Sequence, residues 1–81
     1  MTRPEVLARL QPVFTDFFFD DVVLAPHLTA DDIEGWDSLA QISLVLAIEK
    51  EFGIRFRVGE VEATKNIGEL ADLIARRAAG Q

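Results

Sequence analysis

Cysteine is absent from this 81-residue sequence, so the chain offers neither a disulfide nor a thiol of its own. Tyrosine is absent as well, and His27 is the one histidine. Few side chains can therefore move protons near neutral pH, which argues against a classical enzyme. A domain of this size without a disulfide or a metal is expected to be modestly stable, by a few kcal/mol.

Basic residues are scarce too. Eight Lys and Arg stand against fourteen Asp and Glu, for a net charge of −6, which argues against binding to nucleic acid or to an anionic membrane. No stretch approaches the roughly 20 apolar residues of a membrane span, and no signal-peptide core is visible. We therefore expect a cytoplasmic monomer whose partners present basic surfaces.

What the sequence does contain is enough apolar residues for a core, at 49%. The first helix is predicted from Thr2, which has capping-box spacing to Glu5, with Pro4 in the first turn. Its apolar residues recur at helical spacing, at Val6, Leu10, Val13, Phe14, Phe17 and Phe18. We expect this stripe to pack in the core.

Residues 20–37 show no sustained periodicity and are predicted to form a long loop. Leu24, Leu28 and Ile33 could anchor it, so we expect the loop to be ordered. A connection of this length in a small domain is often functional.

Acidic pairs in this loop, Asp20-Asp21 and Asp31-Asp32, could suggest calcium binding. Neither pair begins the pattern of an EF-hand loop with its closing Glu. His27 also lacks a second ligand at helical spacing. We therefore expect no metal site.

A second helix is predicted to begin at Asp37 or Ser38 and to stop at Gly53. Its expected inner stripe is Leu39, Ile42, Val45, Leu46 and Phe52, widened by Leu44, Ala47 and Ile48. Apolar residues thus run nearly all round the helix, so either it is central or one of its sides meets a partner.

The rest of the chain is predicted to hold a connector and a third helix. Residues 54–58 alternate apolar and basic, but no second strand is available to pair with them. Residues 60–63 could form a short helical turn, and Asn66 with Glu69 three residues on marks a helix start before the final Gly80. The predicted fold is all-α: a small bundle of three main helices plus one short helix, with the long ordered loop between the first two, in one domain of residues 1–81.

The segment Gly35-Trp36-Asp37-Ser38-Leu39 places a hydroxyl at a helix N-terminus, directly after the loop. The simplest interpretation is that Asp37 or Ser38 is only an N-cap. A serine hydrolase is excluded because the segment lacks G-x-S-x-G and no strand precedes it. The only histidine, His27, also lies before Ser38 in the chain, whereas hydrolases with an Asp-Ser-Leu motif need a histidine after it.

This segment, continued by Ile42, Leu46, Ile48, Glu49, Glu51, Phe52 and Ile54, resembles an acyl carrier protein of fatty-acid or polyketide synthesis. The resemblance implies a carrier that is not itself a catalyst. It also implies that a phosphopantetheinyl transferase esterifies the Ser38 hydroxyl with 4′-phosphopantetheine from coenzyme A. Because the chain has no cysteine, the thiol that holds acyl groups as thioesters has to come from this cofactor.

The resemblance further implies contacts with the transferase and with acyl-loading, condensing or acyl-transfer enzymes that carry basic docking patches. The implied contact residues are Asp37, Leu39, Ile42, Leu46, Glu49, Glu60, Val61 and Glu62. The alternative is that the apolar members are core and the acids a solvated face. We also expect apolar side chains to converge beside Ser38 and to line a space for the acyl chain, namely Leu39, Ile42, Leu46, Val61 and Ile67.

Some positions depart from the family pattern. Ala40, Gln41 and Ser43 stand where many fatty-acid carriers have acids, and Trp36 is more typical of free-standing polyketide carriers. These differences favour a polyketide or related specialised pathway. Two alternatives stay open: a peptidyl or aminoacyl carrier, and a structural helical module in which Ser38 is only a helix cap.

Overall fold

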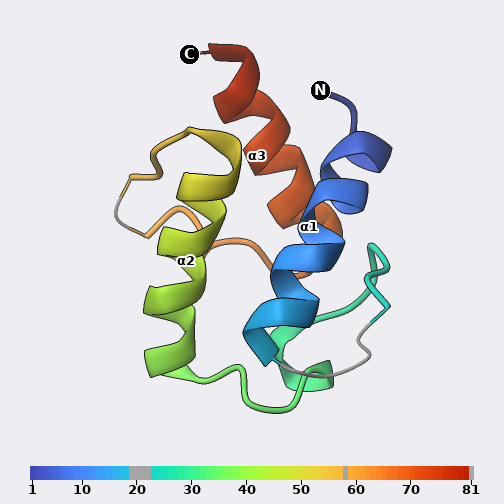
Figure 1. Cartoon of the computed structure of the whole chain (residues 1–81), viewed down its shortest axis with the longest axis vertical. Coiled ribbons are helices and arrows are strands. Elements are labelled where there is room, and N and C mark those ends of the chain that lie inside the picture. The colour runs from blue at the N-terminus through green and yellow to red at the C-terminus, as the bar shows by residue number, and fades with distance from the viewer. Residues whose placement is uncertain (19–22, 58, 81) are drawn as a thin grey trace.

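A computed structural model of the chain describes residues 1–18, 23–57 and 59–80. In it, α1 (Arg3–Phe18) packs against both α2 (Ser38–Phe52) and α3 (Ile67–Gly80), as Figure 1 shows. A short 3-10 helix, η1 (Ala30–Asp32), lies in the connection between α1 and α2. The described residues contain no strand, and the predicted all-α bundle is confirmed.

The helices begin and end at the residues that the sequence indicated. The Thr2 backbone N–H and hydroxyl donate to the Glu5 carboxylate at 3.1 and 2.9 Å, before α1. The Asn66 Oδ1 accepts a hydrogen bond from the Glu69 N–H at 2.8 Å, which caps α3. Gly53 ends α2 with a φ of 64°, in the left-handed region that glycine adopts without steric penalty.

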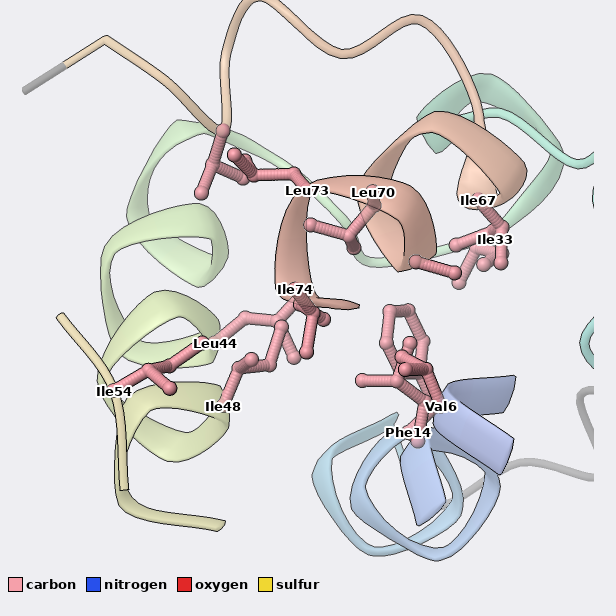
Figure 2. Packing of buried hydrophobic residues seen from close by; sticks show 13 residues of the cluster. Val6, Phe14, Ile33, Leu44, Ile48, Ile54, Ile67, Leu70, Leu73 and Ile74 are labelled. Atoms are coloured by element: carbon pink, nitrogen blue, oxygen red, sulfur yellow. The ribbon is translucent and has the colours of Figure 1, made fainter. Parts of the chain in front are cut away.

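The hydrophobic core lies between the three helices, as the close view in Figure 2 shows. Each helix contributes, and so do the two long connections. The buried residues are Val6, Leu10, Phe14, Ile33, Leu44, Ile48, Ile54, Val61, Ile67, Leu70, Ala71, Leu73 and Ile74. The α1 stripe predicted from sequence is therefore confirmed, with Val13, Phe17 and Phe18 packed partly buried against this core.

Residues 60–63, predicted to form one short helical turn, form a turn in which the Ala63 N–H donates to the Gly59 carbonyl at 3.1 Å, and no longer helix continues from it. The short helix of the structure is η1, in which the Thr29 N–H and hydroxyl both bond the Asp32 carboxylate, at 2.9 and 3.2 Å. These local bonds satisfy the backbone of a single tight turn.

The long loop is held by the anchors expected from sequence. Leu24 and Leu28 are partly buried against the core, and Ile33 is buried within it. The Leu24 N–H also donates to the Gln11 Oε1 at 2.9 Å, which ties the loop to α1. Its first residues, 19–22, lie outside the described part of the chain.

This loop also caps α3. The Ile67 N–H donates to the Leu28 carbonyl at 2.8 Å, and the Gly68 N–H donates to the Pro26 carbonyl at 2.9 Å. The first N–H groups of a helix have no partner within it, so the loop satisfies two donors that would otherwise need water. Gly68 permits this approach, because a Cβ there would lie 3.1 Å from the Pro26 Cβ and 3.2 Å from its carbonyl oxygen.

The connector after α2 is extended, as predicted, and belongs to no strand. Ile54 is buried and Phe56 is partly buried, whereas Arg55 and Arg57 between and after them are exposed. The alternation in sequence is therefore an alternation of burial. Val58, the last residue of the predicted pattern, lies outside the described residues.

Ion pairs tie α1 to both of its neighbours. The Arg3 guanidinium donates to both Asp72 carboxylate oxygens on α3, at 3.0 and 2.6 Å, and lowers the pKa of that carboxyl. The Arg9 guanidinium bonds the Glu51 carboxylate at 3.1 Å and lies 4.5 Å from the Phe52 ring centroid at the end of α2. Both pairs are substantially exposed, so solvent screens them and each contributes little to stability.

Candidate functional site

The N-terminus of α2 assigns different roles to Asp37 and Ser38. The Asp37 Oδ1 accepts a hydrogen bond from the Ala40 N–H at 2.8 Å, so Asp37 is the N-cap. Ser38 is the first residue of the helix and is exposed, and its hydroxyl bonds no other described residue. The interpretation of Ser38 as only a helix cap is therefore wrong, because Asp37 caps the helix.

The turn that presents Ser38 is fixed from behind by aromatic packing. Gly35 has a φ of 90°, a backbone conformation that residues with a Cβ rarely adopt. Trp36 packs edge-on against Phe14 with ring centroids 5.4 Å apart, and it lies 6.0 Å from Phe18. Its indole N–H donates to the Gln41 Oε1 at 2.5 Å, one turn into α2. These contacts hold the turn to the end of α1 and leave the hydroxyl outside.

A groove runs beside Ser38 between the start of α2 and the segment that leads into α3. Trp36 and Gln41 line its near side, and Val61, Glu62 and Lys65 line its far side. The lining is mixed, with an amide, a carboxylate and an ammonium around apolar surface. A chain attached to Ser38 would meet this groove first.

Of the five apolar residues expected to converge beside Ser38, only Val61 lines the groove there. Ile67 is buried in the core, as most of Val61 is, whereas Leu39, Ile42 and Leu46 are 79%, 63% and 61% exposed. The residues that α2 buries are Leu44 and Ile48, which lie on the opposite side of the helix. The five side chains thus belong to two separate surfaces.

The expected inner stripe of α2 needs the same correction. Val45 and Phe52 are partly buried, but Leu39, Ile42 and Leu46 face outward. The error arises because apolar residues run nearly all round α2, so spacing alone could not choose the buried side. Of the two possibilities stated from sequence, an outward side available to a partner fits this arrangement.

Two of the three expected docking acids are engaged within the chain. The Glu49 Oε2 accepts a hydrogen bond from the Phe56 N–H at 2.8 Å. The Glu60 carboxylate pairs with the Arg77 guanidinium and accepts from the Arg57 N–H, and these bonds lower its pKa. Glu62 is exposed at the groove and has no ion pair with any described residue. A partner-binding role for the three acids stays a prediction.

No cluster of three or more metal-ligating side chains occurs among residues 1–18, 23–57 and 59–80. Within the same residues, no helix is both long and apolar enough to cross a membrane.

The geometry at Ser38 fits a phosphodiester-linked group. The hydroxyl is exposed, and the N-terminus of a helix supplies N–H groups and a partial positive charge that favour a phosphate. Asp37 opposes this with its own negative charge. Its carboxylate is directed to the Ala40 N–H, which offsets part of that cost.

Comparisons with known proteins agree with this geometry. The family described as "Phosphopantetheine attachment site" matches residues 19–74, which include Ser38. The acyl carrier protein of Thermosynechococcus vestitus is 28% identical over 98% of this chain and 99% of its own length. That of Cyanidium caldarium is 31% identical over 91% of this chain and 87% of its own.

A solved structure shows the same fold. The solution NMR structure of the holo acyl carrier protein from Geobacter metallireducens superposes with a TM-score of 0.85 at 38% identity. It covers 93% of this chain and 87% of that chain. Because the family model matches more than half of the chain, and relatives more than 30% identical cover most of it, the chain belongs to the acyl carrier protein family: it is a carrier rather than a catalyst, and its cofactor is covalently bound phosphopantetheine.

Proposed function

We propose that Ser38 is the attachment residue and that residues 1–81 act as one carrier domain for acyl intermediates. The observation that supports this proposal lies at the start of α2, where Asp37 caps the helix and the Ser38 hydroxyl is left exposed. A serine used for capping would have its oxygen occupied by a backbone N–H.

Attachment is a phosphoryl transfer from coenzyme A. The Ser38 oxygen forms a bond to the pantetheine-bearing phosphorus, the pyrophosphate P–O bond breaks, and 3′,5′-adenosine bisphosphate leaves. The hydroxyl proton passes to a base of the transferase. The attached group supplies the thiol on which an acyl chain is held as a thioester.

The chain's own residues have four tasks in this chemistry. Asp37 fixes the helix start, and Trp36 fixes the turn against α1. The helix N-terminus stabilises the phosphodiester anion that modification creates. The groove lined by Gln41, Glu62 and Lys65 receives the first part of the arm, where amide and charged groups can bond its polar atoms.

Intact mass tests the proposal directly. Incubation with coenzyme A and a broad-specificity phosphopantetheinyl transferase should add one phosphopantetheine to the wild-type chain and none to Ser38→Ala. Ser43→Ala is the matched control, since Ser43 is an exposed serine one turn further along α2, and it should be modified like wild type. Modification of Ser38→Ala, with a normal helical circular-dichroism spectrum, would disprove the assignment.

The relatives support acyl rather than aminoacyl cargo, because those compared are acyl carrier proteins. For the pathway we propose polyketide or related specialised synthesis in the cytoplasm. Its support is the uncharged start of α2, where Ala40, Gln41 and Ser43 stand, and the use of Trp36 and Gln41 as a bonded pair. Acylation assays with malonyl and fatty-acyl donors test this, and exclusive loading with long fatty-acyl groups would contradict it.

A further inference from the structure

Two side chains that line the groove beside Ser38 end in hydrogen-bond donors. Gln41 carries an amide NH2 group and is half-buried, and Lys65 carries an ammonium and is exposed. Neither group donates to any residue that the structure describes, and Lys65 forms no ion pair with any of them. Both donors are therefore available to a ligand in the groove.

The orientation of the Gln41 amide is set by Trp36. An indole nitrogen can only donate, so the Gln41 atom that accepts from it is the carbonyl oxygen, Oε1. The NH2 group then lies on the side of the amide away from the indole. Trp36 is itself held against Phe14, so the amide does not rotate freely. The Gln41 side chain thus keeps its oxygen for the turn and leaves its donors free.

The two donors lie on opposite sides of the groove. Gln41 comes three residues after Ser38, which places both side chains on the same side of α2. A group bonded to the Ser38 oxygen therefore begins next to this amide. Lys65 is the only cation among the described residues that line the groove. Two acids line it as well, Asp37 and Glu62, and neither pairs with Lys65.

A phosphodiester formed on Ser38 needs partners of this kind. Its non-bridging oxygens share a negative charge and only accept hydrogen bonds. The carboxylate of Asp37 stands beside it with the same sign of charge, in a chain whose net charge is already −6. An ammonium forms strong charge-assisted bonds to phosphate oxygens, and an amide NH2 group adds directed ones.

We propose that Gln41 and Lys65 are positioning residues that hold the phosphodiester formed on Ser38, and that Trp36 fixes the Gln41 amide for this contact. The NH2 group and the ammonium each donate to a non-bridging phosphate oxygen. This inference rests on the attachment at Ser38 proposed above. The arm then leaves Ser38 across the groove toward Lys65, and its first atoms are ordered on the protein.

Nuclear magnetic resonance of the full chain before and after modification tests the contact of Gln41. The chain is modified with coenzyme A and a phosphopantetheinyl transferase, and intact mass establishes that one group was added. The Gln41 side-chain NH2 signals should shift. Those of Gln11, which belongs to α1 and bonds Thr15 and Leu24, are the internal control and should not shift. Unshifted Gln41 NH2 signals would overturn the proposal.

Phosphorus relaxation in the modified chain tests Lys65. A phosphate held on the protein tumbles with the whole molecule, whereas one on a free arm has additional fast motion and a lower transverse relaxation rate. Lys65→Ala should lower this rate about twofold. Lys65→Arg, which keeps the charge, should restore it, and high salt should lower the wild-type rate.

The matched control is Lys50→Ala, because Lys50 is the other lysine of the chain and does not line this groove. It should leave the phosphorus rate unchanged. Equal rates in wild type and Lys65→Ala would overturn the proposal, as would an equal fall in Lys50→Ala.

The part played by Trp36 is tested with Trp36→Phe, which keeps an aromatic ring but removes the indole N–H. The phosphorus rate should fall as it does in Gln41→Met. The double variant should fall no further, because Trp36 acts through Gln41. Additive losses would overturn this step. If Trp36→Phe loses its helical spectrum, Gln41→Glu replaces it: its carboxylate still accepts from the indole but repels the phosphate, so the rate should again fall.

The two proposals fail differently. If the transferase leaves the wild-type chain unmodified, the attachment at Ser38 is wrong and the roles of Gln41 and Lys65 fall with it. If modification proceeds at Ser38 but the variants relax like wild type, only the roles of Gln41 and Lys65 are overturned.

Discussion

Helices α2 and α3 are both rich in apolar residues, yet they use them in opposite ways. On α3, Ile67, Leu70 and Ile74 are at most 1% exposed, so the apolar side of this helix packs in the core. On α2, Leu44 and Ile48 are buried while Leu39, Ile42 and Leu46 stay outside. The apolar residues of α3 thus serve the core, whereas α2 divides its apolar residues between the core and the solvent-exposed surface.

The largest expected effect comes from matched truncations on the two helices. Ile74→Ala should lower the free energy of unfolding by about 2–5 kcal/mol, because it leaves a cavity in the core. Ile42→Ala should change it by less than about 0.5 kcal/mol, since its side chain is largely in water. Urea titration followed by circular dichroism measures both.

If Ile74→Ala does not fold, Ile74→Val serves in its place, with an expected loss of about 0.5–1.5 kcal/mol. Equal losses at positions 42 and 74 would contradict the division between the helices.

A second test concerns the junction of the loop with α3. Gly68→Ala would place a Cβ 3.1 Å from the Pro26 Cβ and 3.2 Å from its carbonyl, so the loop has to move away. We expect a loss of about 1–3 kcal/mol, although alanine is the better helix former. Gly80→Ala, at the far end of the same helix, is the matched control in a thermal melt. A more stable Gly68→Ala would show that the loop yields without cost.

The cap of α2 should matter less for stability. Asp37→Ala removes the acceptor of the Ala40 N–H and should cost about 0.5–2 kcal/mol. Asp37→Asn retains an acceptor oxygen and should recover much of this loss. The comparison also separates capping from charge, because a transferase that requires the carboxylate itself would modify Asp37→Asn slowly despite its stable helix.

The smallest expected effect is on the pH dependence of stability. Arg77 lowers the pKa of the Glu60 carboxyl below its ordinary value, and Arg3 does the same for Asp72. A depressed pKa contributes stability above the unfolded value near pH 4, and this contribution is lost as the pH falls through the folded value. The melting temperature should therefore decrease as the pH is lowered below about 4, and Glu60→Gln should make this dependence on pH less steep. A wild-type chain whose slope equals that of Glu60→Gln would contradict this.

The sequence predicted the elements well because their ends are marked locally. Capping residues such as Thr2 and Asn66 act on backbone N–H groups three residues away, so their pairing is visible in the printed sequence. Ser38 was predicted in a different way, from the resemblance of residues 35–39 to acyl carrier proteins, because its position at a helix start by itself indicates only a cap.

The orientation of α2 was harder to predict because it is decided by tertiary contacts. Leu44 and Leu46 are the same residue type two positions apart, and only packing against the other helices determines which is buried. The engagement of Glu49 with the Phe56 N–H depends likewise on the chain turning back at Gly53. Short-range patterns do not contain such information.

The carbonyls of Pro26 and Leu28 have a practical consequence for following the protein at work. Amide protons at the start of a helix normally exchange quickly with solvent, but those of Ile67 and Gly68 are held by this loop. Their hydrogen-exchange rates therefore report whether the loop is closed on α3. These two amides lie far along the chain from Ser38, so a change in their exchange rates would measure how much a bound enzyme disturbs the carrier.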